Sequence, residues 1–167
     1  MSRSISLDEL VQTVQSRFQD DPPNGWQLGW DRERCLDLVR SAASPHPARN
    51  LTSFDDAFCN WYEVCIDPSD GKQHWKQRTL TIQFSFIAPV SCLYWDRPKR
   101  STQGDLIASA PESYQAVEAR VRAAVWAVGF FEAPSDWLNH EIEGIQLELS
   151  GTHHVTLGKC LFCDYDG

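Results

Sequence analysis

Apolar and polar side chains alternate from Trp75 to Phe86, where the sequence reads WKQRTLTIQFSF. Four apolar residues fall on one face and four polar residues on the other: Leu80, Ile82, Phe84 and Phe86 against Thr79, Thr81, Gln83 and Ser85. Because successive side chains of a strand point to opposite faces, this alternation predicts a strand with one buried and one solvated face. A parallel sheet covered on both faces would give a near-continuous apolar run instead. The pattern therefore predicts an antiparallel sheet.

Other segments have the periodicity of helices. Ser6 and Glu9 form a capping box in sequence, and apolar residues then recur at helical spacing. A further apolar stripe follows Pro111, a residue suited to the first turn of a helix, and Gly129 is placed to end it. The predicted helices are residues 7–18, 31–44, 111–128 and a short turn at 134–139.

The remaining periodic segments are expected to be strands. Turn-forming residues at 67–71 favour a hairpin between the strand at 75–86 and an aromatic, β-branched segment before it. The predicted strands are residues 58–66, 75–86, 90–95, 145–149 and 155–165. Strands that follow one another, with helices before and between them, predict an α+β fold. We expect one domain, residues 1–167, with an antiparallel sheet of about five strands and helices packed on one face.

Composition limits the class of protein. The chain has 167 residues, with seven Trp, eight Phe and four Tyr, which is enough apolar material for a core without disulfide bonds. It contains no apolar run of membrane-spanning length, and its N-terminus lacks the apolar core of a signal peptide. We therefore expect a cytoplasmic protein whose six cysteines are reduced, with no membrane association.

No residue pattern predicts a catalytic site, so we expect a binding protein and not an enzyme. The histidines lie outside the known catalytic motifs, and there is no glycine-rich phosphate loop. One alternative is an enzyme or ligand-binding domain whose pocket is lined by Trp61, Glu63 and Trp95. No cofactor is expected.

A metal site near the C-terminus is a second alternative. His153, His154, Cys160 and Cys163 have the side chains that zinc prefers. However, Cys160 and Cys163 fall in the predicted strand 155–165, where an odd separation places them on opposite faces. We therefore favour structural cysteines over a zinc-stabilised domain.

The charge of the chain is acidic and unevenly distributed. The net charge of −8 disfavours nucleic acid as a partner, because phosphates require basic surfaces. Residues 129–167 contain seven acidic side chains and only one basic side chain, Lys159. Such a surface attracts cationic proteins, and an aromatic residue among the carboxylates can anchor an interface. The predicted partner-binding residues are Glu132, Asp136, Trp137, Glu141, Glu143, Glu148, Asp164 and Asp166.

The segment FSFIAPVSCLYW, from Phe84 to Trp95, together with the size and acidity of the chain, resembles immunity proteins of bacterial polymorphic or contact-dependent toxin systems. The resemblance is one of general character across most of the chain and includes no diagnostic motif. It implies a single-domain inhibitor that binds a cognate toxin domain, often a basic nuclease. Under this hypothesis, acidic side chains would oppose the cationic substrate groove of the toxin.

Overall fold

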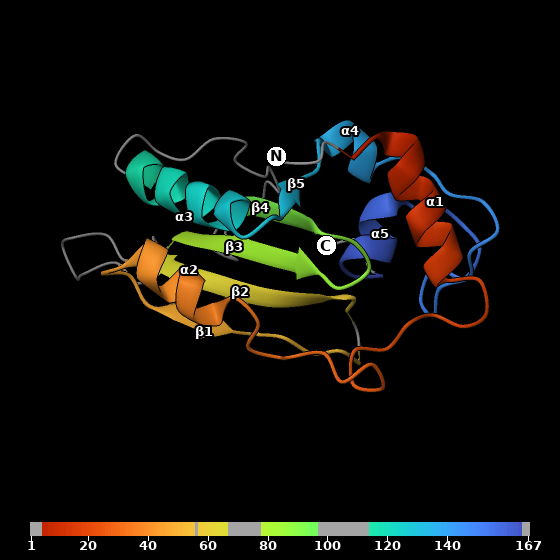
Figure 1. Ribbon diagram of the computed structural model, residues 1–167, viewed down its shortest axis with the longest axis horizontal. Helices are drawn as coiled ribbons and strands as arrows, with labels where there is room; N and C mark the ends of the chain where they lie inside the picture. Colours follow the sequence, from red (N-terminus) through yellow and green to blue (C-terminus); the bar gives the residue numbers. More distant parts are fainter. Residues whose placement is uncertain (1–4, 56, 67–77, 97–113, 165–167) are drawn as a thin grey trace, which may run out of the picture.

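The protein has an α+β fold built on one five-stranded sheet (Figure 1). The computed structural model describes residues 5–55, 57–66, 78–96 and 114–164. The strands, in spatial order, are β1 (Ala48–Asn50), β2 (Cys59–Ile66), β3 (Arg78–Ser85), β4 (Val90–Asp96) and β5 (Phe131–Glu132). The helices are α1 (Leu7–Arg17), α2 (Leu36–Ala43), α3 (Gln115–Ala127), α4 (Ser135–Leu138) and α5 (Leu157–Leu161). The pairs from β1 to β4 are antiparallel, whereas β4 and β5 are parallel.

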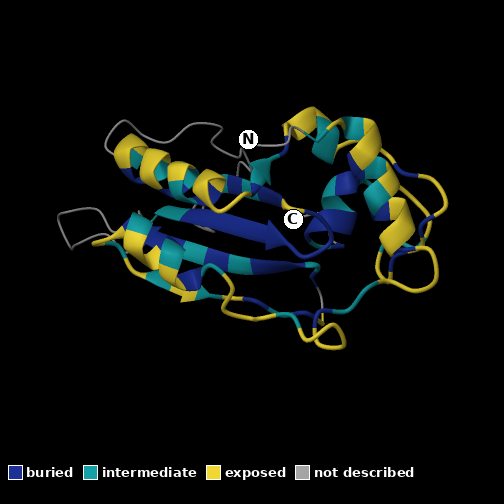
Figure 2. Cartoon of the chain, in the orientation of Figure 1, coloured by how far each residue is buried: buried dark blue, intermediate teal, exposed yellow. Residues whose placement is uncertain are grey.

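Helices α2 and α3 cover one face of the sheet. The apolar residues of β3 that the alternation assigns to the core, Leu80, Ile82 and Phe84, are fully buried there. They share a hydrophobic cluster with Val39 of α2 and Val121 of α3. In Figure 2 the strand β3 is buried from its third residue onward, while both helices present exposed residues on their outer sides. Helices α2 and α3 therefore pack against the face that carries Leu80, Ile82 and Phe84.

The other three helices gather beyond one end of the sheet (Figure 1). They enclose a second hydrophobic cluster, in which Leu10 and Val14 of α1 pack with Leu161 of α5. Phe86, just after β3, belongs to this cluster, whereas Phe84 belongs to the first one. The α1 capping box is formed as predicted, with the Ser6 backbone amide donating to a carboxylate oxygen of Glu9 at 2.8 Å.

The sheet has the predicted number of strands but a different membership. The prediction of strands at 145–149 and 155–165 was wrong. Leu147 and Gly151 instead exchange two backbone hydrogen bonds across a three-residue loop. The side chain of Thr156 accepts a hydrogen bond from the amide of Lys159, which caps α5 within the second segment. The edges of the sheet are β1 and β5, which are too short to produce a period of two in the sequence.

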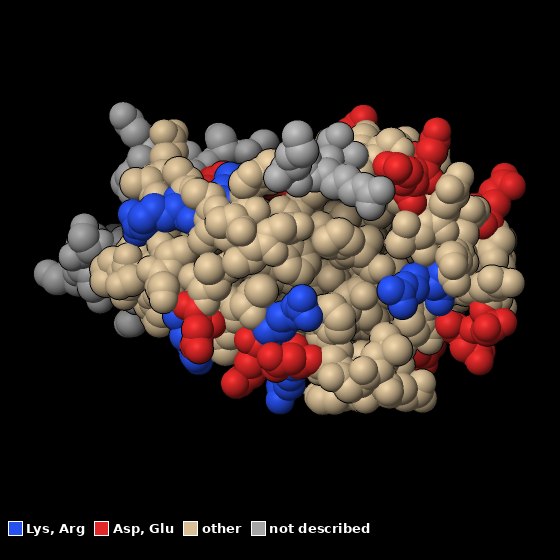
Figure 3. Space-filling view, viewed as in Figure 1, with Lys and Arg blue, Asp and Glu red and all other residues tan. Residues whose placement is uncertain are grey.

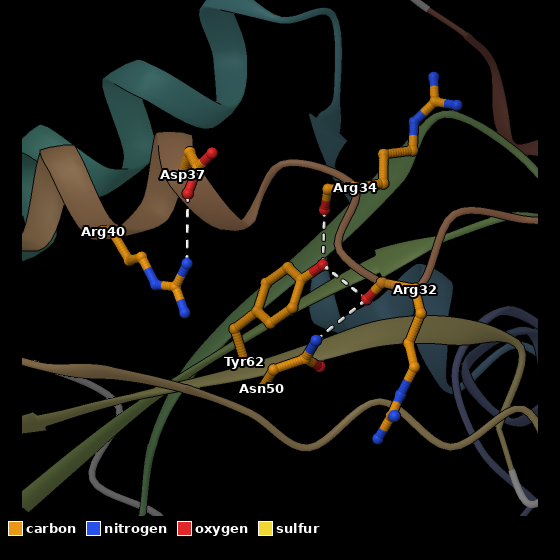
Figure 4. Close-up of polar contacts among 6 residues, drawn as sticks. All are labelled: Arg32, Arg34, Asp37, Arg40, Asn50 and Tyr62. Carbon is orange, nitrogen blue, oxygen red and sulfur yellow. Dashed lines mark hydrogen bonds and ion pairs between the residues drawn. The ribbon is translucent and has the colours of Figure 1, made fainter.

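Helix α2 begins at Leu36, five residues after the predicted start. The hydroxyl of Tyr62 donates to the carbonyl oxygen of Arg34 at 2.6 Å and lies 3.3 Å from that of Arg32. The side-chain amide of Asn50 also donates to the Arg32 carbonyl, at 3.2 Å (Figure 4). Since these carbonyl oxygens accept hydrogen bonds from side chains of the sheet, they do not accept hydrogen bonds from helical backbone amides, and residues 32–35 form turns.

The second face of the sheet is less solvated than the alternation predicts. Thr81 is fully buried, and Gln83 is 3% exposed. The strand β3 is central, so Gln83 lies between Trp61 on β2 and Cys92 on β4. Strands on both sides shield a polar residue that would be exposed on an edge strand. The prediction of a solvated face was therefore wrong at the centre of the sheet.

Candidate partner-binding site

Acidic side chains concentrate at the end of the molecule that contains α1, α4 and α5. We define this acidic end as residues 5–25, 53–58 and 133–164. Its described carboxylates are Asp8, Glu9, Asp20, Asp21, Asp55, Asp136, Glu141, Glu143, Glu148 and Asp164. The basic side chains described there are Arg17 and Lys159. Figure 3 shows acidic side chains around this end, while most of the visible basic side chains lie over the sheet half.

Four of the predicted site residues lie exposed at the acidic end: Asp136, Glu141, Glu143 and Glu148. Glu141 lies 3.2 Å from His154, and both side chains are largely exposed. Trp137 is half-buried, and its ring lies 5.7 Å from that of Phe131 on the second hydrophobic cluster. Its indole therefore contributes more to the fold than to an open surface.

Two other predicted residues are engaged within the protein, and one lies outside the described residues. Glu132 on β5 forms an ion pair with Arg122 of α3. The same guanidinium contacts Glu118, so Glu132 belongs to the contact between α3 and β5 and shares one positive charge with Glu118. Asp164 is 5% exposed and bonded to backbone amides. Asp166 is the residue outside the described part.

Asp164 holds the loop that presents Glu148 and Leu149. Its carboxylate accepts hydrogen bonds from the amide of Leu149 at 2.6 Å and from the amide of Ser150 at 3.1 Å. It also accepts from the Ser150 hydroxyl, and Lys159 donates to the same hydroxyl at 3.0 Å. Leu149 is 69% exposed at the tip of this loop. The buried carboxylate thus fixes an exposed acidic and apolar pair in place.

A small pocket opens next to this loop. Its volume is about 200 Å³. The lining residues come from four segments of the chain: Pro22, Pro23, Asn24, Phe54, Asp55, Ala57, Phe58, Glu148, Leu149 and Asp164. Asp55 and Glu148 are exposed, and Phe54 is buried beneath them. The pocket therefore combines an apolar interior with carboxylates at its surface.

A loop after α1 forms one side of the pocket and carries an exposed tryptophan. Trp26 is 49% exposed, and its indole N–H donates to the carboxylate of Asp55 at 3.0 Å. Its ring meets that of Phe54 edge to face, with centroids 5.0 Å apart. The side-chain amide of Asn24 holds this loop by donating to the carbonyl oxygen of Phe54 at 3.3 Å. These residues were not predicted as a site, because they are far from the C-terminal carboxylates in sequence.

The proposed enzyme pocket of Trp61, Glu63 and Trp95 is not assembled. Trp95 is buried on the face covered by α3, where its indole donates to Glu118 at 2.7 Å. Glu63 pairs in register with Thr81, on the opposite face of the sheet, and its carboxylate lies 3.1 Å from Arg49. The three side chains therefore cannot line one cavity.

The predicted zinc ligands are also separated. Within residues 5–55, 57–66, 78–96 and 114–164, no group of three or more His, Cys, Asp or Glu side chains could hold a metal ion. His153 and His154 are exposed, whereas Cys160 is buried in α5. The argument that opposite strand faces separate Cys160 from Cys163 was wrong, because the segment is helical. Burial raises the pKa of the Cys160 thiol to about 12, with a smaller contribution from Asp164.

We expect the protein to lose stability as the pH rises above about 9. Desolvation raises the pKa of Cys92 to about 11 and that of Cys160 to about 12, from an ordinary value of 9.0. The unfolded chain releases these protons first, so the stabilisation is complete below pH 9.0 and is lost as the pH rises through the folded values. Urea unfolding at about pH 8 and about pH 10.5 measures the loss. The double variant Cys92→Ala, Cys160→Ala should lose less stability over this interval, and an unchanged loss would contradict the expectation.

No described helix is both long and apolar enough to cross a membrane. No known protein-family model, curated protein or solved structure matches this chain.

Proposed function

We propose that the protein binds and inhibits a cationic partner protein through its acidic end, as an immunity protein inhibits its cognate toxin in the cytoplasm. The observation that supports this proposal is the spatial convergence of carboxylates from both ends of the sequence. Asp8, Asp20 and Asp21 join Glu143 and Glu148 at one end of the fold. The described charge of this end is far from compensated by Arg17 and Lys159.

Such a surface favours a basic protein over other partners. Clustered negative charge steers a cationic surface toward the site and raises the association rate. The same charge repels the phosphates of nucleic acids. Exposed apolar side chains at the acidic end, Trp26 and Leu149, can be buried on contact and supply affinity that charge alone does not give.

The proposal is tested by neutralising the acidic end. The triple variant Glu141→Gln, Glu143→Gln, Glu148→Gln is titrated calorimetrically with the product of the gene immediately upstream. We expect tight binding by the unmodified protein and a loss of affinity of about tenfold or more in the variant. Raising NaCl from about 0.05 M to about 0.5 M should slow association, since salt screens exposed charges.

A matched variant controls for net charge. The variant Asp31→Asn, Glu33→Gln, Asp37→Asn also removes three exposed carboxylates, but from the turns before α2 and from α2 itself. The Asp37–Arg40 ion pair that it removes is exposed, so its loss costs little stability. This control should bind like the unmodified protein. The absence of a complex, or equal weakening by both variants, would contradict the proposal.

A further inference from the structure

We infer that the pocket lined by Phe54, Asp55, Glu148 and Leu149 binds one arginine side chain of the partner. This inference rests on the proposed function and specifies the group that the acidic end recognises. It is supported by the size, charge and aromatic lining of the pocket, and by the hydrogen bonds and packing that hold the lining residues in place.

The size of the pocket fits a single side chain. At about 200 Å³ it is smaller than the ~300–1,000 Å³ that pockets for drug-sized ligands occupy. A long side chain that enters from a partner surface needs no more space than this. The pocket therefore suits one anchoring residue of a protein, and not a free metabolite.

The charge of the pocket selects a cation. Asp55 and Glu148 reach it from different parts of the chain, and both are exposed. Asp55 accepts the Trp26 indole N–H through one carboxylate oxygen, Oδ1, and Glu148 forms no ion pair among the described residues. Asp164 also lines the pocket, but its carboxylate is buried and hydrogen-bonded to the 148–150 loop. A guanidinium group forms short, charge-assisted hydrogen bonds with such carboxylates.

The lining favours arginine over lysine. Phe54 and Phe58 contribute aromatic surface, and Pro22, Pro23 and Leu149 contribute aliphatic surface. A planar guanidinium can stack on an aromatic ring while its edges bind carboxylates, whereas a strongly hydrated ammonium is a point charge. The methylene groups of the side chain would lie against the aliphatic walls.

The walls of the pocket are fixed before a ligand arrives. Asp164 bonds the amides of Leu149 and Ser150, which positions the Glu148 side of the pocket. On the other side, Gly25 packs so closely on Phe54 that an added Cβ would lie 2.5 Å from the ring. A site that is already ordered loses less conformational entropy on binding.

The inference is tested by nuclear magnetic resonance with the full-length protein and small probes. Nα-acetyl-arginine amide is the probe, and the corresponding citrulline amide is its uncharged control. The reporter is the Trp26 indole N–H, which donates to Asp55 and is assigned with the variant Trp26→Phe. We expect a saturable shift of this signal with the arginine probe, a smaller shift with the lysine analogue, and no saturable shift with citrulline.

Two matched variants make the test specific. Glu148→Gln should weaken binding of the arginine probe by about tenfold, because it removes a charge-assisted contact. Glu143→Gln, which changes an exposed carboxylate of the acidic end outside the pocket, should leave probe binding unchanged. Equal shifts with arginine and citrulline, or equal effects of the two variants, would overturn the inference. If the triple variant still weakens the partner complex, the proposed function would stand without this pocket.

Discussion

Replacing Phe84 by alanine is expected to lower the free energy of unfolding by about 3–5 kcal/mol. Phe84 is fully buried, and its ring meets Phe130 edge to face with centroids 4.9 Å apart. It also lies 6.0 Å from the ring of Tyr62. Truncation would remove these contacts and leave a cavity between the sheet and α3. Urea unfolding followed by circular dichroism measures the change.

The control for this prediction is Trp126→Ala. Trp126 is an aromatic residue of α3 that is 56% exposed, so its truncation should change the free energy of unfolding by less than about 1 kcal/mol. Similar losses for the two variants would show that Phe84 does not lie at the centre of the core.

Replacing Asp164 by alanine is expected to have the second-largest effect, a loss of about 2–4 kcal/mol. The buried carboxylate accepts bonds from the amides of Leu149 and Ser150, and each hydrogen bond to a charged group contributes more than a neutral one. The loop at 148–150 should then become mobile. Hydrogen exchange of the Leu149 and Ser150 amides, measured by nuclear magnetic resonance, should accelerate.

The variant Glu143→Gln provides the comparison for Asp164→Ala. Glu143 lies at the same end of the protein, but its side chain is exposed. It forms no ion pair with another described residue. It should leave both the stability and the amide exchange of the loop unchanged. If the Leu149 and Ser150 amides stayed protected from hydrogen exchange in Asp164→Ala, the expectation that Asp164 holds this loop would be contradicted.

The long periodic segments could be predicted from the sequence, and the short ones could not. The alternation around Leu80 and Ile82 gave β3, and the capping box gave α1, because each pattern persists over several turns or residue pairs. The strand predicted at 145–149 failed because three apolar residues at alternate positions also fit a tight loop. In the last segment, Leu157 and Leu161 are four residues apart, which is a helical signal over only one turn.

The candidate site was predicted only in part, for a different reason. Composition identified Glu143 and Glu148 as members of an acidic surface. The contribution of Asp20 and Asp55 depends on tertiary packing that joins segments far apart in the sequence. The ion pair of Glu132 with Arg122 likewise depends on how α3 meets β5. Charge along a chain predicts a surface only when the packing of that chain is known.

The two hydrophobic clusters divide the molecule into a helix-covered sheet and an end built from α1, α4 and α5. The strands β2 and β3 extend from one cluster to the edge of the other, so each cluster is anchored on the same rigid sheet. Substitutions far apart in a protein have nearly additive effects on stability. Substitutions at the tip of the 148–150 loop should therefore leave the stability of the helix-covered sheet nearly unchanged. The surface of one end can thus change without unfolding the rest of the protein.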